Sequence, residues 1–200
     1  MKFYRSLVRA TQPAVEPVTL AEAKEHLRVD ISTDDALISA IVKASREFCE
    51  EYLDRSLVYT QWTMRMDAIP WEIELPRPPV AQAGTTTATV VTYTLETQAT
   101  ATLDTSTYRV DRTATPGVIR TVYAGTWPSH LFDENSVSVT WWGGYGADGT
   151  AVPAAVRSAM LMLVASLYEN RSAVLAGTIS KEIEFGVKAL LDTQRWGSYR

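Results

Sequence analysis

Apolar residues at helical spacing characterise the N-terminal part of the chain. Thr19 and Glu22 have the Ser/Thr-x-x-Glu spacing of a capping box, in which each side chain satisfies a free backbone N–H at the start of a helix. We therefore predict a short helix over residues 20–29. A second helix, announced by Ser32-Thr33-Asp34-Asp35, is predicted to run to Leu53.

The two faces of this second helix differ in polarity. Its apolar face is predicted from helical spacing to contain Leu37, Ile38, Ile41, Phe48, Cys49, Tyr52 and Leu53. Its wetter face is predicted to carry Lys43, Arg46, Glu47, Glu50 and Glu51. Cys49 lies on the apolar face, so we expect a buried and unreactive thiol rather than a nucleophile, which would need a base nearby.

Alternation with a period of two residues dominates residues 57–145. Such alternation sends one set of side chains to a core and the other to water, and it predicts β-strands. Eleven of the 23 residues from 85 to 107 are threonine, which favours strands over helix interiors. A hairpin is expected around Glu96-Thr97-Gln98, although no glycine marks its turn.

Helical spacing returns after Pro153, which suits the first turn of a helix. We predict a long helix to about Arg171 and a short terminal helix over Val187–Trp196. The fold class is then α+β: a helical core of two N-terminal helices, one long C-terminal helix and a short terminal helix, with an inserted antiparallel β module. The expected divisions are 1–56, 57–145 and 146–200.

The composition of the chain argues against several classes of protein. A chain of 200 residues, 46% of them apolar, buries enough surface to fold without a metal or a disulfide, and its single cysteine allows no intrachain disulfide. A net charge of −4 argues against a dedicated nucleic-acid binder. The most apolar run, Ala159–Tyr168, is too short to span a membrane. The first residues have no apolar run of the signal-peptide type, so we expect a cytoplasmic protein that does not enter a membrane.

One glycine-rich motif could indicate an enzyme. Residues Gly144–Gly149 spell G-x-G-x-x-G, the pattern of a dinucleotide-binding loop. In that fold the third glycine lies in the first helical turn, whereas here the helix is predicted to begin later, at Pro153. We interpret the motif as a strand-to-helix turn, and a small nucleotide-binding enzyme remains an alternative.

Other catalytic or metal-binding signals are weak. The two histidines, His26 and His130, have no second histidine or cysteine at the spacing of metal ligands. No nucleophile–base pair stands out either. We therefore expect no catalytic residues, no bound metal and no cofactor.

Tryptophans are concentrated in the β zone. Trp141 and Trp142 are neighbours on one predicted strand, so their side chains point to opposite faces of a sheet. One of them can fill the core, and the other, together with Tyr145, is a candidate for a contact between subunits because aromatic residues are enriched at interfaces. Coverage by another part of the same chain is equally compatible with the sequence. A glycan- or peptide-binding β module with exposed tryptophans is a further alternative.

Short segments along nearly the whole chain resemble the head–tail connector (adaptor) family of tailed bacteriophages, in the branch that carries an inserted β module. The resemblance depends on their order: Glu16–Val29, Asp34–Ile38, Arg46-Glu47, Glu50–Leu53, Arg55–Leu57, Gln61-Trp62, Ile73–Pro79, Tyr108–Asp111, Gly143–Gly146, Val152-Pro153 and Tyr168–Arg171.

The resemblance implies a structural protein of the virion neck, assembled in the cytoplasm of a host bacterium. Such a connector forms a homo-oligomeric ring of twelve subunits beneath the portal. It extends the DNA channel, through which DNA passes without sequence-specific binding, and it offers a platform for a stopper or tail-terminator protein. A tail-completion or stopper protein of the same neck is the nearest alternative.

The C-terminal segment is the candidate portal contact. It combines a short amphipathic helix with an end rich in aromatic residues and arginine, the residue types that dominate interface hot spots. In related connectors, C-terminal segments reach toward the portal. The alternative is that this helix packs on its own helical core. The residues proposed to bind the portal are Leu190, Leu191, Arg195, Trp196, Tyr199 and Arg200.

Overall fold

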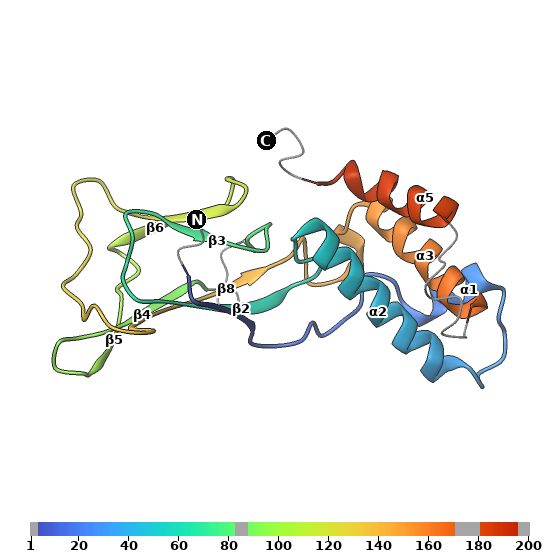
Figure 1. Ribbon diagram of the computed structural model, residues 1–200, viewed down its shortest axis with the longest axis horizontal. Helices are drawn as coiled ribbons and strands as arrows, with labels where there is room; N and C mark the ends of the chain where they lie inside the picture. The colour runs from blue at the N-terminus through green and yellow to red at the C-terminus, as the bar shows by residue number, and fades with distance from the viewer. Residues whose placement is uncertain (1–3, 83–87, 171–180, 196–200) are drawn as a thin grey trace. The chain divides into compact units, whose positions relative to one another are not determined.

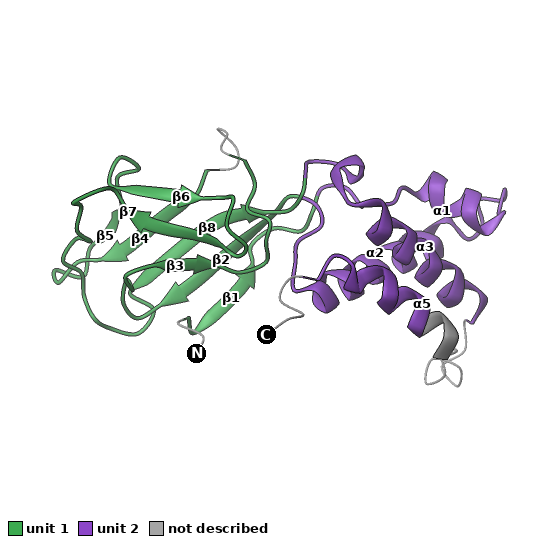
Figure 2. Ribbon diagram, turned by 90° about the horizontal axis from the view of Figure 1, so that it is seen from above, with its two compact units in different colours: residues 1–13, 59–145 green, residues 14–58, 146–200 purple. Residues whose placement is uncertain are grey.

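The computed structural model describes residues 4–82, 88–170 and 181–195. The chain forms two compact units, each built from two stretches of sequence (Figure 2). Residues 1–13 and 59–145 form a unit of strands, called the β unit, and residues 14–58 and 146–200 form the helical unit. The predicted α+β class is confirmed.

The elements follow one another in the order helices, strands, helices, except for one early strand (Figure 1). The strands are β1 (Ser6–Arg9), β2 (Thr60–Met66), β3 (Ile73–Leu75), β4 (Val90–Thr94), β5 (Thr100–Thr102), β6 (Tyr108–Asp111), β7 (Gly117–Thr121) and β8 (Val137–Gly143). The described helices are α1 (Leu20–Leu27), α2 (Asp35–Leu53), a short 3₁₀ helix at Gly149–Ala151, α3 (Ala154–Glu169) and α5 (Lys181–Asp192).

Five strands of the β unit form an antiparallel sheet in the order β1-β2-β8-β4-β5. β2 and β8 are its central pair, with Trp62 opposite Trp141 and Met64 opposite Val139. Buried and more exposed residues alternate along both strands, as the period-two pattern predicts. This alternation gives the sheet one apolar face.

The second sheet covers that apolar face. It is antiparallel, with the order β3-β7-β6, and Figure 1 shows it stacked on the larger sheet. The core between the two sheets consists of Trp62, Met64, Met66, Ile69, Ile73, Leu75, Val80, Val91, Leu103, Tyr108, Ile119, Val137, Val139 and Trp141.

The expected hairpin near residue 97 joins β4 to β5. The Leu95 N–H donates to the Ala99 carbonyl at 2.9 Å, and the Gln98 N–H donates back to the Leu95 carbonyl at 2.8 Å. Gln98 has a φ of 63°, in the left-handed region that glycine usually occupies. The turn therefore forms without glycine because a glutamine takes the strained position.

Strand β1 is an element that the sequence pattern did not indicate. It pairs with β2 in antiparallel register, with Leu7 opposite Met64 and Val8 opposite Thr63, and it forms one edge of the larger sheet. Leu7 packs against the core of the β unit. Four residues are too few to show a clear alternation, so the strand depends on its long-range partner.

Helix α1 begins at the capping box that the sequence predicts. The Glu22 N–H donates to the Thr19 hydroxyl at 3.2 Å, and the Thr19 N–H donates to Glu22 Oε2 at 2.8 Å. The Thr19 hydroxyl also donates to Glu22 Oε2 at 2.9 Å. The hydrogen bonds that this carboxylate accepts from the Thr19 N–H and hydroxyl lower its pKa, and an ion pair with Arg157 adds to the effect. Helix α1 ends at Leu27, earlier than expected, because Arg28 is left-handed with a φ of 57°.

Helix α5 begins at Lys181, well before the predicted start at Val187. Glycine is unfavourable inside a helix, yet α5 continues through Gly186. A Cβ atom built on Gly186 would be 3.1 Å from the Met162 side chain of α3, so glycine permits a close approach of the two helices. Among the described residues no helix is both long and apolar enough to cross a membrane.

The predicted polarity of α2 is partly wrong. Arg46 and Glu50, assigned to the wet face, are buried with exposed fractions of 0% and 2%. Leu37 and Phe48, assigned to the apolar face, are exposed. The face of α2 that packs inward is rotated toward the two charged residues, which compensate each other's charge.

An ion-pair network surrounds Arg46. Its Nη1 donates to Glu50 Oε2 and its Nε donates to Glu16 Oε2, both at 2.7 Å. The other oxygen of Glu50 accepts the Leu57 N–H at 3.0 Å. Burial lowers the pKa of Arg46, but the negative charges of Glu50 and Glu16 outweigh this effect and the pKa is raised overall. The network thus ties three segments of the helical unit together.

Candidate functional site

The two neighbouring tryptophans of β8 have different environments. Trp141 is fully buried in the core of its own unit, next to Trp62 across the strand pair. Trp142 is partly exposed on the opposite face of the sheet, where Gln61 lies opposite it on β2. Tyr145, just beyond the strand, is also partly exposed. Of the candidate subunit contacts, Trp142 and Tyr145 are accessible, whereas Trp141 serves the core.

The terminal helix packs within the helical unit. Val187 and Leu191 are buried, with exposed fractions of 1% and 0%, and α5 lies against α3 and α2. The Tyr52 hydroxyl donates to Asp192 Oδ1 at 2.9 Å. The apolar side of this helix is therefore occupied by its own core, which is the alternative that the sequence left open.

The packing of α5 decides which of the predicted portal-binding residues are accessible to a partner. Leu190 is partly exposed and Arg195 is exposed, with its guanidinium carbon 5.5 Å from the centre of the Tyr52 ring. Trp196, Tyr199 and Arg200 lie outside the described residues. Leu191 is an anchor of the helix within its own unit, and Leu190 and Arg195 are the described side chains available to a partner.

An exposed aromatic group at the loops of the β unit was not identified from the sequence. Trp71, Tyr123 and Phe132 have exposed fractions of 80%, 98% and 78%. The Trp127 indole N–H donates to the Trp71 carbonyl at 3.3 Å, which joins the loop after β2 to the loop after β7. The sequence did contain a signal for this group, because large aromatic residues are unusual in loops, which are normally polar.

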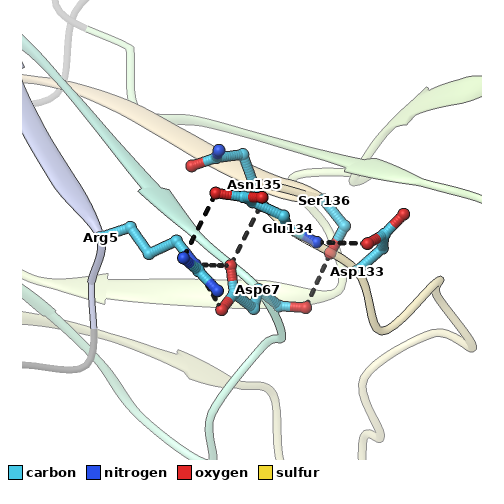
Figure 3. Close-up of polar contacts among 6 residues, drawn as sticks. All are labelled: Arg5, Asp67, Asp133, Glu134, Asn135 and Ser136. Atoms are coloured by element: carbon cyan, nitrogen blue, oxygen red, sulfur yellow. Dashed lines mark hydrogen bonds and ion pairs between the residues drawn. The ribbon is translucent and has the colours of Figure 1, made fainter.

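A polar cluster fixes the start of the edge strand β1 (Figure 3). Arg5 Nε donates to both oxygens of Asp67 at 2.6 Å, and its Nη1 donates to Glu134 Oε1 at 3.3 Å. Asp67 Oδ1 also accepts the Asn135 N–H at 3.0 Å. The hydrogen bonds from Arg5 and from the Asn135 backbone lower the pKa of Asp67. The cluster holds β1 and the loop before β8 together.

The glycine-rich loop is explained by close contacts rather than by a bound phosphate. A Cβ atom on Gly149 would be 2.2 Å from the Pro17 carbonyl oxygen, and one on Gly146 would be 2.6 Å from the Ala151 Cβ. Strand β8 belongs to an antiparallel sheet, whereas a dinucleotide-binding loop follows a parallel strand. The geometry does not support the nucleotide-binding alternative.

The histidine at position 130 has a structural role. Its Nε2 lies 3.1 Å from the Ile69 N–H, which donates to it, and its Nδ1 lies 3.1 Å from the Pro128 carbonyl. Both ring nitrogens are therefore used to hold the loop. Among the described residues, no group of three or more His, Cys, Asp or Glu side chains is arranged to hold a metal ion.

Cys49 should be unreactive in the native protein. Its side chain is fully buried, and burial, with a contribution from the Glu50 charge, raises the pKa of the thiol from 9.0 to about 12. The thiolate population is then roughly a thousandfold lower than for a free thiol. With a disulfide reagent at pH 8 we expect almost no reaction in buffer and one thiol per chain in denaturant. Fast, complete labelling of the folded protein would contradict this prediction.

Comparisons with known proteins agree with the fold. The family model described as phage gp6-like head-tail connector protein matches residues 17–109. No curated protein sequence matches the chain. A chain from the neck of an empty GTA particle, computed with C6 symmetry, is 22% identical with a TM-score of 0.76, covering 96% of this chain and 95% of that chain.

Two further solved structures have the same coverage, 96% of this chain and 95% of theirs, at 20% identity. One is a virion of a native gene transfer agent (GTA) particle, with a TM-score of 0.76. The other is the neck of a native GTA particle computed with C12 symmetry, with a TM-score of 0.74. These likenesses show that the fold extends over nearly the whole chain.

The residues matched by the family model include elements of both units. Residues 17–109 begin just before the capping box of α1 and extend through strand β6, so the match includes parts of both units. A head-tail connector is a structural protein rather than an enzyme, in agreement with the prediction from the sequence. Over residues 17–109 the chain matches the phage gp6-like head-tail connector family, which confirms the resemblance predicted from the sequence.

Proposed function

We propose that the chain is a ring-forming subunit of the neck of a tailed phage or phage-like particle, located between the portal and the tail and assembled in the cytoplasm of the host bacterium. The observation that carries this proposal is the fold shared with chains from GTA particle necks over 96% of the chain. The family match gives independent support.

The proposed ring contains twelve copies. One of the similar neck structures was computed with C12 symmetry, and twelve copies would satisfy it with one subunit in each position. A ring needs two different surfaces on each subunit, because its contacts are head-to-tail and close a cycle. Trp142 and Tyr145, both partly exposed, are candidates for one of these surfaces.

The charge of the chain suits contact with DNA in transit. Binding to DNA becomes strong when basic side chains neutralise phosphates and release counterions. The chain carries 19 basic and 23 acidic residues, so a ring of such subunits would have a negative net charge. DNA would then pass through the proposed channel without being retained.

The proposed partners are the portal on one side and a stopper or tail-terminator protein on the other. The portal contact is assigned to the end of the chain, where Leu190 and Arg195 are accessible and are followed by Trp196, Tyr199 and Arg200. Tryptophan, tyrosine and arginine are the residues most enriched at interface hot spots. The buried Val187 and Leu191 would hold the helix in place so that its end projects to the partner.

Deletion of residues 196–200 tests the portal contact. We expect the shortened protein to keep its melting temperature, because these residues follow the last buried side chain of α5, Leu191. Co-expression with the portal protein of the same particle, followed by native mass spectrometry, should show loss of the portal complex.

The matched control is Leu191→Ala, which should lower the free energy of unfolding by about 2–5 kcal/mol because it leaves a cavity in the helical unit. If the deletion lowers the melting temperature while the portal complex persists, the terminal residues belong to the core and the assignment is wrong. If the full-length chain forms no complex with the portal, the proposed function itself fails.

A further inference from the structure

The two outward faces of the β unit differ in charge. On the larger sheet, the outward residues are those that alternate with the core residues along the five strands. They are Ser6 and Val8 of β1, Gln61, Thr63 and Arg65 of β2, Ser138, Thr140 and Trp142 of β8, Val90, Thr92 and Thr94 of β4, and Thr100 and Thr102 of β5. We call these residues the threonine face; Arg65 is its one charged member.

The outward face of the smaller sheet can be compared with the threonine face of the same unit. It carries Glu74, Arg109, Asp111 and Arg120, and Arg120 Nε pairs with Glu72 Oε1 at 2.9 Å. Alternating charges of this kind are typical of a sheet face in contact with water. The same unit therefore has one strongly charged face and one face whose strands carry a single charged residue, with the ion-paired Arg5 and Glu134 beside its β1 edge.

Apolar side chains are exposed on the threonine face. Val8 and Val90 have exposed fractions of 56% and 37%, and Trp142 is partly exposed. The edge strand β5, with the sequence TAT, carries no charged residue, whereas the edge strand β1, SLVR, carries Arg9. Soluble proteins usually protect flat sheet edges with charges, so the lack of charge along β5 favours coverage of that edge by another protein surface.

The size of the threonine face fits a contact between folded subunits. Five strands spaced by about 4.8 Å, with on average about five residues rising 3.3 Å each, give a footprint of roughly 24 by 17 Å. This is roughly 400 Å², about half of the ~800 Å² that each partner contributes to a standard interface. Depletion of charge with retention of aromatic residues is also the composition of an interface centre.

We infer that the threonine face is buried against the next copy of this chain in the ring. The inference rests on the proposed function and adds to it the surface through which the subunits meet. Because a ring contact is head-to-tail, the face meets a different surface of the neighbour and need not complement itself. Trp142 lies on this face, which links it to the candidate subunit contact named above.

Lysine substitutions on this face test the inference. The double variant Val90→Lys/Thr102→Lys places two charges on residues that are exposed in the single chain, so the melting temperature should not change. Val8→Lys, on the opposite edge of the sheet, is a second variant of the same kind. Unpaired charges at an interface oppose association, and we expect at least about a tenfold loss of rings.

The matched control is Glu74→Lys on the charged face of the smaller sheet, which changes the net charge by a similar amount. Each variant is co-expressed with the portal protein, the subunits per portal are counted by native mass spectrometry, and the free subunit is melted separately. The inference is supported if both lysine variants fold but fail to form rings while Glu74→Lys forms them.

Three outcomes would overturn the inference. Rings of normal abundance from both lysine variants would show that the threonine face is not at the subunit contact. If the unmodified free chain forms a dimer, and the lysine variants lose this dimer but still form rings, the face pairs with itself outside the ring. If the unmodified chain forms no ring with the portal, the proposed function fails first and the inference fails with it.

Discussion

Replacement of Arg46 by methionine should lower the free energy of unfolding of the helical unit by about 3–5 kcal/mol. Methionine is similar in length and fills much of the same space, but it leaves the Glu50 carboxylate without its cation. Glu50 is only 2% exposed, so water cannot compensate its charge. Glu16, the second partner, is partly exposed and can be rehydrated. Chemical denaturation followed by circular dichroism measures the change.

Two further variants separate charge from packing. Lys43→Met removes an exposed cation from the same helix and should change the stability by less than about 0.5 kcal/mol. Adding Glu50→Gln to Arg46→Met removes the buried charge but keeps an oxygen to accept the Leu57 N–H, and it should recover part of the loss. If the double variant is as unstable as the single one, the network contributes through packing rather than through charge.

The orientation of α2 shows a limit of sequence patterns. Periodicity located the helix and its end at Leu53, because the apolar residues recur at helical spacing. It placed Arg46 and Glu50 in water, because a pattern of residue types treats every charge as exposed. The partner that allows their burial, Glu16, lies before α1 and reaches α2 only in the folded chain. Pairs of this kind cannot be inferred from local spacing.

Long-range pairing explains the other differences. The alternation along β2 and β8 is visible in the sequence, but their adjacency brings together segments separated by more than 70 residues. Strand β1 pairs with β2 although both N-terminal helices lie between them in the sequence. Gly186 has the residue type of a helix boundary, yet its role is to let α5 approach Met162. In each case the deciding contact is tertiary.

The candidate surfaces were predictable to different degrees. The opposite orientations of Trp141 and Trp142 follow from strand geometry, but which of them faces the core depends on the second sheet. The threonine content of residues 85–107 indicated strands, whereas the contrast between a charged and an uncharged sheet face appears only once the strand order is known. The exposed Tyr123 and Phe132 lie in loops, for which periodicity gives no information.

Replacement of Trp141 by alanine should lower the free energy of unfolding of the β unit by about 3–5 kcal/mol. The side chain is fully buried between the sheets, and the surrounding residues come from several strands that cannot collapse into the space. Its indole N–H makes no hydrogen bond to any described residue, so the loss comes from packing. Trp141→Phe should therefore cost much less, and denaturant titration of the two variants measures the difference.

The matched control is Trp142→Ala, which should have little effect on stability but a large effect on ring formation. The residue is next in the chain but points to the threonine face, where it is partly exposed, so alanine should cost only about 1 kcal/mol of stability. If this face meets a neighbouring subunit, the same variant should reduce ring formation on the portal about tenfold or more, since a buried tryptophan is among the strongest interface contacts. Trp141→Phe should leave assembly intact. A large loss of stability for Trp142→Ala, with normal rings, would instead make Trp142 a packing residue of its own chain and remove the aromatic anchor from the proposed contact.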